Sequence, residues 1–455
     1  MSLFIVGLDI TAFNVALPSI ASGLEASLSG LQWTVSGYTL AMASLLLFSG
    51  SMADRLGRRR TFVAGLSAFS LASLLCSLAP SVELLVVFRV LQGIGASMLN
   101  PVAMSIVTNT FTDPRERAQA VGVWGAVFGI SMALGPIVGG ALVSTAGWEW
   151  IFLINVPLGL AAIALTLRFV PESRAPRPRR FDPAGQALMI ALLASVTYGI
   201  IEAPGAGWTS SGIVAAFSVA ALALLGILLH EPRREEPLID LRFFRSVPFS
   251  AAIAISVAAF AAFGGFLFLN TLYLQDVRGL SPVGAGLATV PMALMTVLVS
   301  PLSGRIVGRH GPRVPLLVAG TSMAIASAML VALAPDTPLV LLVAAYVVFG
   351  IGLGAVNAPV TNAAVSGMPR AQAGVAAAVA TTSRQFGQTL GVALVGAIVA
   401  SHGGTDLAAA SHPAWWLLSG LGVLVIVLAL AATIERSRES ARRTAAALNP
   451  EALAA

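Results

Sequence analysis

The chain has 455 residues, of which 57% are hydrophobic and only 10% are charged, and its mean hydropathy is +0.89. Soluble globular proteins carry about 25% charged residues, so this composition excludes an ordinary soluble protein. The formal net charge of +6 rests on arginine alone, because the sequence contains no lysine. Without lysine the chain can form neither a Walker A phosphate loop nor a Schiff-base enzyme, so uphill work needs an ion gradient or another subunit.

Apolar runs of about 20 residues recur along the whole length, which predicts an all-α polytopic membrane protein. We expect fourteen membrane-spanning helices, at 2–21, 32–52, 61–79, 83–107, 119–144, 150–170, 185–203, 211–229, 249–274, 284–304, 314–334, 338–365, 375–401 and 414–434. The single cysteine and four scattered histidines give no metal-ligand spacing, so no metal or other cofactor is expected.

The arginines predict the orientation. Of the 26, only Arg278 falls in a loop on the far side, while Arg89 and Arg384 fall inside spans. The positive-inside rule then places both termini in the cytoplasm. An arginine-rich, lysine-free composition is typical of a high-GC bacterial genome, so we expect a multi-pass protein of the bacterial inner membrane. The same pattern explains the basic isoelectric point without a nucleic-acid partner.

Two long cytoplasmic loops, 171–184 and 230–248, are rich in proline and charge and flank a less polar pair of spans at 185–229. We interpret that pair as an insertion between a six-helix bundle at 1–170 and another at 249–434, followed by a cytoplasmic tail at 435–455. GSMADRLGRRR after span two matches GRIVGRHGPR after span ten, with Asp54 replaced by Gly308. Two halves repeated in parallel are typical of secondary transporters.

Span one contains a lone acid, Asp9, in the stretch LDITAFNVALP. An acid inside the membrane costs several kcal/mol, by estimates that vary, and marks a functional site. Two interpretations stay open: a proton-binding carboxylate, or a structural acid paired with an arginine. Only eight residues precede Asp9 and none of them is basic, so we expect translation to start upstream of Met1.

Span four carries Arg89, with Gln92 on the same helical face. An arginine inside a span must face a partner or a water-filled cavity. Asp9 is the one acid within the first six spans that lies away from an interface, so we expect both charges to face a common cavity. Their depths differ by several ångström along the helices, which leaves direct contact open.

The loop at 50–60 offers a tight glycine turn and a cluster of charges, including Asp54, Arg55, Gly57 and Arg58. Asp54 is expected to cap span three or to contact another helix N-terminus. The loop is either a gate latch or a topology anchor.

In span five, Gly129, Pro136 and Gly140 share a face on which helices can approach closely, and Pro136 predicts a kink. Plain tight packing would give the same pattern.

Polar residues follow one face of several spans in both halves, which predicts a shared central cavity, although helix–helix hydrogen bonds explain any single face equally well. The candidate cavity residues are Asn14, Gln32, Ser36, Gln92, Asn270, Tyr273, Asn357, Thr361, Arg384, Gln385 and Gln388.

The motifs GSMADRLGRRR, RVLQGIGA and GISMALGPIVGGAL resemble the signatures of the major facilitator superfamily. LDITAFNVALP and WEWIFLINVPLG resemble those of its 14-helix drug:proton antiporter branch. The resemblance covers nearly the whole chain. It implies a two-bundle fold, alternating access and proton-coupled export of lipophilic drugs or antibiotics.

Carried over by residue, the resemblance implies that Asp9 binds the proton and that Arg89 couples it. It places Asp54 and Arg58 in a gate. It also implies an antiporter kink, for which the candidates are Gly129, Gly135, Pro136, Gly139 and Gly140.

No acid lies within span ten or span thirteen, where relatives that export divalent cations carry one. We therefore expect lipophilic neutral or monocationic substrates and a monomeric protein in the lipid bilayer, driven by the proton gradient. An uncoupled facilitator or a lipid or metabolite exporter of the same fold is the alternative. A membrane enzyme or receptor would need a cluster of reactive side chains or a large soluble domain, and the sequence predicts neither.

Overall fold

The computed structural model describes the chain except for residues 112, 176–180, 367, 369–371, 403–405 and 449–455. Within the described part every predicted span is helical, and no strand occurs there. Eleven helical segments of that part are long and apolar enough to cross a membrane, and shorter apolar helices occur at Gly129–Thr145 and Arg313–Met329. The remaining predicted span is the helix Ala373–Ser401. The sequence prediction of an all-helical polytopic protein is confirmed.

The chain divides into two compact units. Unit 1 comprises Met1–Phe181 and Leu267–Ala293, and unit 2 comprises Asp182–Phe266 and Leu294–Ala455. The helices that cover 247–272 and 282–310 therefore contribute one end to each unit. The finer division into two six-helix bundles and an inserted pair stays a prediction.

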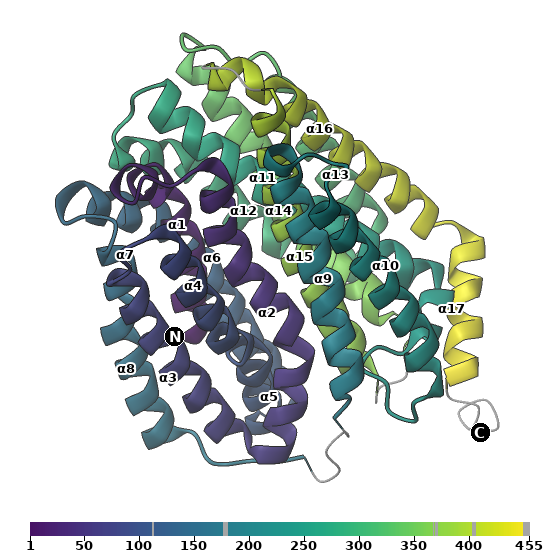
Figure 1. Cartoon of the computed structure of the whole chain (residues 1–455). Coiled ribbons are helices and arrows are strands. Elements are labelled where there is room, and N and C mark those ends of the chain that lie inside the picture. The colour runs from purple at the N-terminus through teal and green to yellow at the C-terminus, as the bar shows by residue number, and fades with distance from the viewer. Residues whose placement is uncertain (112, 176–180, 367, 369–371, 403–405, 449–455) are drawn as a thin grey trace. The chain divides into compact units, whose positions relative to one another are not determined.

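Unit 1 begins with eight helices, whose courses can be followed in Figure 1. They are α1 Ser2–Gly23, α2 Leu28–Leu56, α3 Arg58–Ser77, α4 Val82–Ser97, α5 Asn100–Thr110, α6 Pro114–Thr145, α7 Trp150–Leu153 and α8 Asn155–Phe169. α1 packs against α6, and α4 packs against both α2 and α3. Buried apolar side chains such as Tyr38, Leu66 and Phe69 fill the core between these helices.

Two of the predicted spans in unit 1 are interrupted. The fourth ends as α4 at Ser97 and resumes as α5 at Asn100, and the sixth changes from α7 to α8 at Asn155. The cause is local, because Pro101 has no N–H to donate to the carbonyl of Ser97, and Pro157 has none for Leu153. The second break places Asn155 at the first position of α8.

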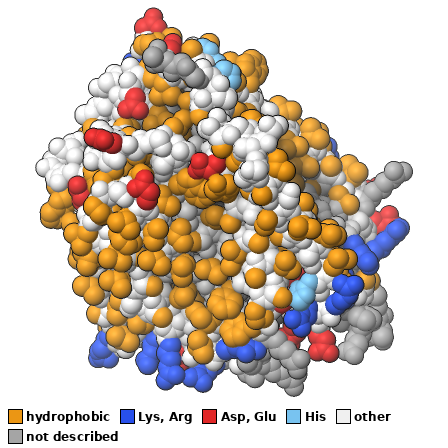
Figure 2. Space-filling view, in the orientation of Figure 1, with side chains coloured by type: hydrophobic (Ala, Val, Ile, Leu, Met, Phe, Trp, Pro, Cys, Tyr) orange, Lys and Arg blue, Asp and Glu red, His pale blue; other side chains and the backbone are white. Residues whose placement is uncertain are grey.

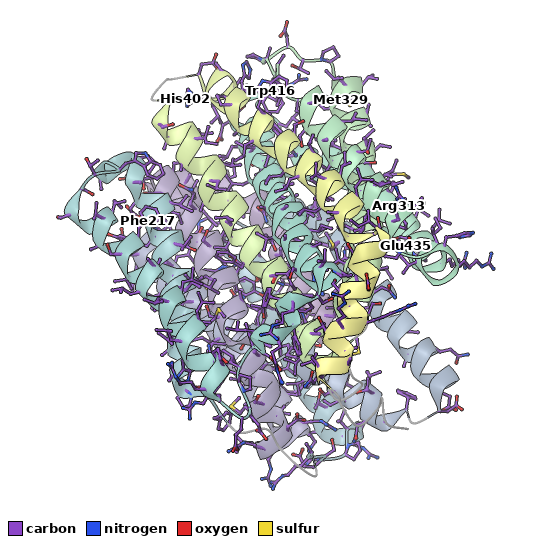
Figure 3. The ribbon with its side chains drawn as sticks, turned by 90° about the vertical axis from the view of Figure 1, so that its right-hand side faces the viewer. Phe217, Arg313, Met329, His402, Trp416 and Glu435 are labelled. Carbon is purple, nitrogen blue, oxygen red and sulfur yellow. The ribbon has the colours of Figure 1, made fainter. Side chains whose placement is uncertain are left out.

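The remaining helices lie mostly in unit 2, and several of them face the viewer in Figure 3. They are α9 Pro183–Ala206, α10 Ser211–His230, the short 3-10 helices Glu231–Arg233 and Leu241–Arg245, α11 Val247–Leu272 with a π-helical turn Tyr273–Val277, α12 Pro282–His310, α13 Arg313–Met329, α14 Leu339–Val365, α15 Ala373–Ser401, α16 Leu407–Ala432 and α17 Glu435–Leu448. Residues 267–293, which include part of two of these helices, belong to unit 1. α13 packs against α14 and α16. The hairpin α9–α10, predicted as an insertion, contacts α15 through α9.

The surface of unit 1 separates apolar from basic side chains. Figure 2 shows hydrophobic side chains along its flank and basic side chains at its lower end, below α2, α3 and α8, where the chain carries Arg55, Arg58 and Arg168. An apolar flank with arginines at one end is what a membrane protein needs at its cytoplasmic boundary. The predicted cytoplasmic arginines at positions 177, 179, 180 and 370 lie outside the described residues.

Asp182 ties the two ends of the α9–α10 hairpin together. As N-cap of α9, its Oδ1 accepts the backbone N–H of Gly185 at 3.0 Å. The same oxygen lies 2.9 Å from Nε2 of His230 and 3.8 Å from Nη2 of Arg234. Burial by itself raises the pKa of Asp182, but the Gly185 N–H, the hydrogen bond and charge of His230, and the charge of Arg234 outweigh it, so the net pKa is lowered.

Asp182→Asn keeps a capping oxygen and removes the charge. Because the pKa of Asp182 is lowered on folding, its charge stabilises the fold above the pKa of the unfolded chain, and that contribution disappears as the pH falls through the folded-state pKa. We expect the variant to melt below the wild type at neutral pH and together with it in strong acid. A thermal unfolding series across pH in detergent checks this, with Asp336→Asn in an exposed loop as the control. A difference in melting temperature between Asp182→Asn and the wild type that stays constant across the pH series would contradict this prediction.

Candidate functional site

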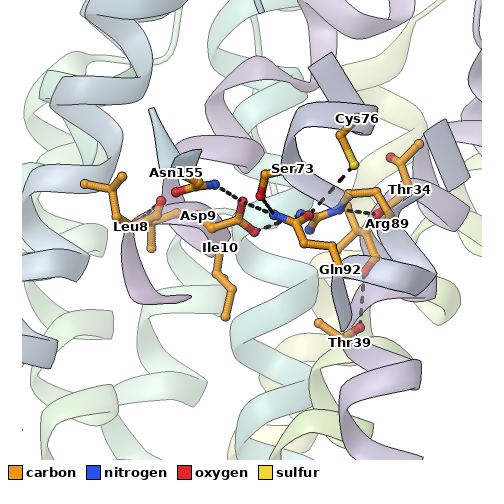
Figure 4. Close-up of polar contacts among 12 residues, drawn as sticks. Leu8, Asp9, Ile10, Thr34, Thr39, Ser73, Cys76, Arg89, Gln92 and Asn155 are labelled. Atoms are coloured by element: carbon orange, nitrogen blue, oxygen red, sulfur yellow. Dashed lines mark hydrogen bonds and ion pairs between the residues drawn. The ribbon is translucent and has the colours of Figure 1, made fainter. Parts of the chain in front are cut away.

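Asp9 and Arg89 form a buried ion pair in unit 1. Nη1 of Arg89 lies 2.8 Å from Oδ2 of Asp9, and the two residues are 1% and 2% exposed respectively. Figure 4 shows the pair joining α1 to α4. The sequence predicted that both charges face one cavity and left direct contact open. The structure brings them into direct contact.

Aromatic rings and a backbone carbonyl hold Arg89 in place. Its Cζ lies 4.2 Å from the ring centroid of Phe13 on α1 and 4.2 Å from that of Tyr38 on α2. Its Nε donates to the carbonyl of Thr34 at 3.1 Å. A guanidinium that is desolvated over aromatic faces gains about 2 kcal/mol from each. These contacts hold the guanidinium at a defined position beside Asp9.

Gln92 links the pair to α3. Its Nε2 donates to Oδ1 of Asp9 at 2.9 Å and to Oγ of Ser73 at 2.8 Å, and its Oε1 accepts from Nη1 of Arg89 at 2.6 Å. The sequence analysis placed Gln92 among the cavity residues. In the structure it is fully buried and belongs to the Asp9 network.

Asn155 also belongs to the network around Asp9, and the sequence analysis did not predict this. Its Nδ2 donates to Oδ1 of Asp9 at 2.9 Å, and the residue is fully buried. The break between α7 and α8 puts this side chain at the start of α8. The signal was present in the sequence, since Asn155 is a polar residue inside the apolar motif WEWIFLINVPLG and lies two residues before a proline.

Three donors therefore meet the two oxygens of Asp9, from Arg89, Gln92 and Asn155. This arrangement satisfies a deprotonated carboxylate. Protonation removes the ion pair and makes one oxygen a donor, which then faces other donors. Adding one proton to Asp9 thus weakens contacts between α1, α4 and α8 at the same time. Such a site can convert a proton into a change of helix packing.

Glycines of α6 bring it against α1 next to Asp9. A Cβ on Gly139 would lie 2.7 Å from Cα of Ala12, and a Cβ on Gly135 would overlap the side chain of Thr11. Pro136 lies inside the helix between them, as predicted. On the other side, a Cβ on Gly140 would lie 2.6 Å from the carbonyl oxygen of Pro282 in α12. Of the predicted kink residues, Gly135, Gly139 and Gly140 lie where a neighbouring helix leaves no room for a Cβ, whereas Gly129 is half-buried.

Gly135→Leu should abolish the export that the sequence resemblance implies, because the leucine side chain would occupy the space of Thr11 and push α1 away from α6. Export of a drug from cells and thermal stability of the purified variant measure this. Gly420→Leu in α16 is the matched control, since a Cβ there meets no atom within 4 Å. Full activity with normal stability in Gly135→Leu would show that the α1–α6 contact is not needed.

The predicted gate residues lie at the turn between α2 and α3. Gly57 alone connects the helices, with φ of 113°, and a Cβ there would lie 2.6 Å from Oε1 of Glu172. Nη2 of Arg58 lies 3.1 Å from Oδ1 of Asp54. Arg55 lies over the ring of Phe181, with Cζ 4.4 Å from its centroid.

The cap of α3 differs from the prediction. Oε1 of Glu172 accepts the N–H of Arg59 at 3.1 Å, and Oε2 accepts that of Arg60 at 3.2 Å. Asp54 instead pairs with Arg58, four residues along the chain. The segment that follows α8 also binds the turn between α2 and α3, since the N–H of Ala175 donates to the carbonyl of Asp54 at 3.1 Å. The turn and the segment after α8 are therefore fastened together within unit 1.

The predicted cavity residues divide between the units. Asn14, Gln32, Ser36, Asn270 and Tyr273 are buried in unit 1. Asn14 donates to the carbonyl of Ile10 in its own helix at 2.7 Å. Tyr273 begins the π-helical turn that follows α11, and such turns are frequent at functional sites. A common cavity stays a prediction.

In unit 2, Asn357, Thr361 and Arg384 form one cluster across α14 and α15. Nη1 of Arg384 donates to Oδ1 of Asn357 at 3.0 Å and to Oγ1 of Thr361 at 3.4 Å. Gln385 and Gln388 follow in α15, and the shared face that the helical spacing predicted stays a prediction. Gln388 is buried, and Gln385 is half-buried.

The sequence model of the Major Facilitator Superfamily matches residues 1–392. The "Tetracenomycin C resistance and export protein" of Streptomyces glaucescens is 38% identical over 405 residues, which is 89% of this chain and 75% of the relative. The "Multidrug resistance protein Stp" of Mycobacterium tuberculosis is 36% identical over 88% of this chain and 74% of the relative. The "Methylenomycin A resistance protein" of Streptomyces coelicolor is 35% identical over 96% and 92%.

Solved structures share the fold at low identity. A D-xylose-proton symporter matches with a TM-score of 0.67 and 14% identity, over 94% of this chain and 94% of the other. A POT family peptide transporter matches with a TM-score of 0.67 and 14% identity, over 95% and 96%. These likenesses show the fold alone.

Proposed function

The chain belongs to the major facilitator superfamily of transporters, and from that premise we propose that it exports lipophilic drugs or antibiotics in exchange for protons. The observation that carries the proposal is the buried carboxylate of Asp9, which three side-chain donors from other helices surround. The printed names of the relatives, which refer to drug resistance, efflux and export, support the class of substrate. No catalytic step is part of the proposal, since a transporter moves its substrate unchanged.

In the proposed cycle Asp9 takes up a proton from outside and releases it to the cytoplasm. Deprotonated Asp9 holds Arg89, Gln92 and Asn155, and so holds α1, α4 and α8 together. Protonated Asp9 releases them, and the helices can repack. The close contact of Gly139 with Ala12, three residues after Asp9, then passes the change to α6. Drug and proton compete for opposite states of one network, so the proton gradient drives export without ATP.

The remaining assignments belong to the same proposal. The protein lies in the bacterial inner membrane with both termini in the cytoplasm, because the arginines gather on one side. It acts as a monomer on small lipophilic substrates. Asp54, Arg55, Gly57 and Arg58 form the cytoplasmic gate, supported by the ion pair between Asp54 and Arg58. A movement of the segment after α8 that carries Glu172 would break its hydrogen bonds to the N-terminus of α3. The turn between α2 and α3 would then be free to move.

A susceptibility screen tests the proposal. The chain is expressed in a bacterium that lacks its own drug pumps, and lipophilic antibiotics and dyes are tested with and without an uncoupler. We expect resistance to a subset of compounds, and we expect the uncoupler to restore their accumulation in the cells. Resistance that persists in the uncoupler would favour the uncoupled facilitator, and no change with any compound would contradict drug export.

A further inference from the structure

Arg384 is a second arginine inside a span, in α15 of unit 2. Its Nη1 donates to Oδ1 of Asn357 and to Oγ1 of Thr361, and its Nη2 donates to Oγ1 of Thr381 at 2.8 Å. All three partners are neutral oxygens. The cluster therefore fixes the guanidinium in position without cancelling its charge.

Arg384 contrasts in this respect with Arg89, whose charge Asp9 neutralises. Every acidic residue of unit 2 except Glu451 is described, and none of those described forms an ion pair with Arg384. Arg384 is also only half-buried, so part of its side chain is accessible. A charge kept inside the membrane without a counter-charge from its own unit is costly, and such residues mark paths for substrates and ions.

The geometry leaves donors for a ligand. A guanidinium carries five N–H groups. Three hydrogen bonds engage the Nη1 and Nη2 groups, whereas the Nε–H and the second N–H of Nη2 make none with the described residues of unit 2. An Nε–H beside an Nη2–H is a fork that binds two oxygens of one anionic group. At the next residue of α15, Oε1 of Gln385 is buried without a hydrogen-bond partner in the described part of the chain, which leaves an acceptor unused.

We propose that Arg384 is the subsite for an anionic or strongly accepting oxygen of the exported compound, such as a carboxylate, a phenolate or an enolate. Gln385 then accepts a neighbouring hydroxyl of the same compound. The inference rests on the proposed export function and narrows its substrate class. Since Asp9 is already paired and Arg384 is not, the site favours neutral and anionic compounds and disfavours the monocations that the sequence left open.

Two dyes with one ring system test the charge preference. Fluorescein is an anion with a carboxylate and a phenolate, and a rhodamine ester is a cation on the same three-ring xanthene core. Binding of each to the purified full chain in lipid nanodiscs is measured by fluorescence anisotropy. We expect the wild type to bind fluorescein about tenfold or more tightly than the rhodamine ester. Arg384→Gln should lose that preference, and Arg384→Lys, which keeps the charge without the fork, should fall between them.

Arg305→Gln is the control, because Arg305 is an exposed arginine in the same unit and should leave the preference unchanged. Stronger or equal binding of the rhodamine ester, no binding of fluorescein, or an unchanged preference in Arg384→Gln would overturn the proposal. If Arg384→Gln fails to fold, the dye preference of Arg384→Lys is compared with that of the wild type. A reduced preference for fluorescein in Arg384→Lys supports the proposal, and an unchanged preference overturns it. The result is separable from proton coupling, since Asp9→Asn should keep the dye preference while losing accumulation driven by a pH gradient.

Discussion

Asp9→Asn should abolish drug accumulation driven by a pH gradient while the chain still binds drug. Asparagine cannot take up or release a proton, so the network around Arg89 stays in one state. Its amide oxygen can still accept from Gln92 or Asn155, which keeps part of the packing. Reconstituted vesicles with an imposed pH gradient, and a drug identified by the susceptibility screen, measure the uptake directly.

The control for this variant is Asp336→Asn, the same chemical change in an exposed loop, which should transport like the wild type. Drug binding to purified Asp9→Asn separates loss of coupling from loss of folding. If the variant accumulates drug against its gradient whenever a pH gradient is imposed, the proton site lies elsewhere and the proposed cycle is wrong.

Arg89→Gln should abolish export and also destabilise the protein. It leaves Asp9, which is 2% exposed, without its counter-charge. Removing one partner of a buried ion pair costs roughly 3–5 kcal/mol, because the other charge stays buried. Thermal unfolding in detergent measures the stability, and drug export from cells measures the function.

The double variant Asp9→Asn with Arg89→Gln removes both charges and is the matched control. Replacing both members of a buried pair by neutral groups is often close to neutral for stability. We expect the double variant to recover most of the stability lost in Arg89→Gln and to remain inactive. Export at the wild-type level in Arg89→Gln would contradict a coupling role for this residue.

Much of the fold was predictable, because the membrane imposes strong patterns. Apolar length alone located the spans, and helices are the one structure that continuous apolar runs can form in lipid. What the pattern could not reveal were the breaks before Asn100 and at Asn155. Each depends on a proline four residues after the last carbonyl of the preceding helix, inside a run that is otherwise apolar.

The sequence analysis predicted the charged residues of the site, but it did not predict the neutral residues Asn155 and Ser73. Asp9 and Arg89 stand out because charge inside a membrane is rare. Ser73 does not stand out, since serine occurs in spans for many reasons, and Asn155 gives only the weak signal of a polar residue shortly before a proline. Their part in the network depends on how α8 and α3 approach α1 and α4, which a single sequence does not contain. The same holds for Glu172, which lies 113 residues along the chain from the N–H of Arg59 that it accepts.

Helical periodicity predicted that Arg384, Gln385 and Gln388 share one face of α15, which is helical over these residues. It did not show that Asn357 and Thr361 of α14 bind the guanidinium, nor that neutral oxygens are its partners in unit 2. That distinction decides which substrates the face favours. The spacing of residues along a helix predicts a polar face. Only the hydrogen bonds and ion pairs in the structure show whether a charge on that face already has a counter-charge.

The central claim is that Asp9 exchanges a proton as drug binds. Proton release from purified protein tests it most directly, in weakly buffered detergent solution with a pH indicator, on addition of a drug from the susceptibility screen. The account predicts that drug binding releases protons from the wild type and from Asp336→Asn, and that Asp9→Asn binds the drug and releases none. Equal proton release from Asp9→Asn and the wild type would contradict the account.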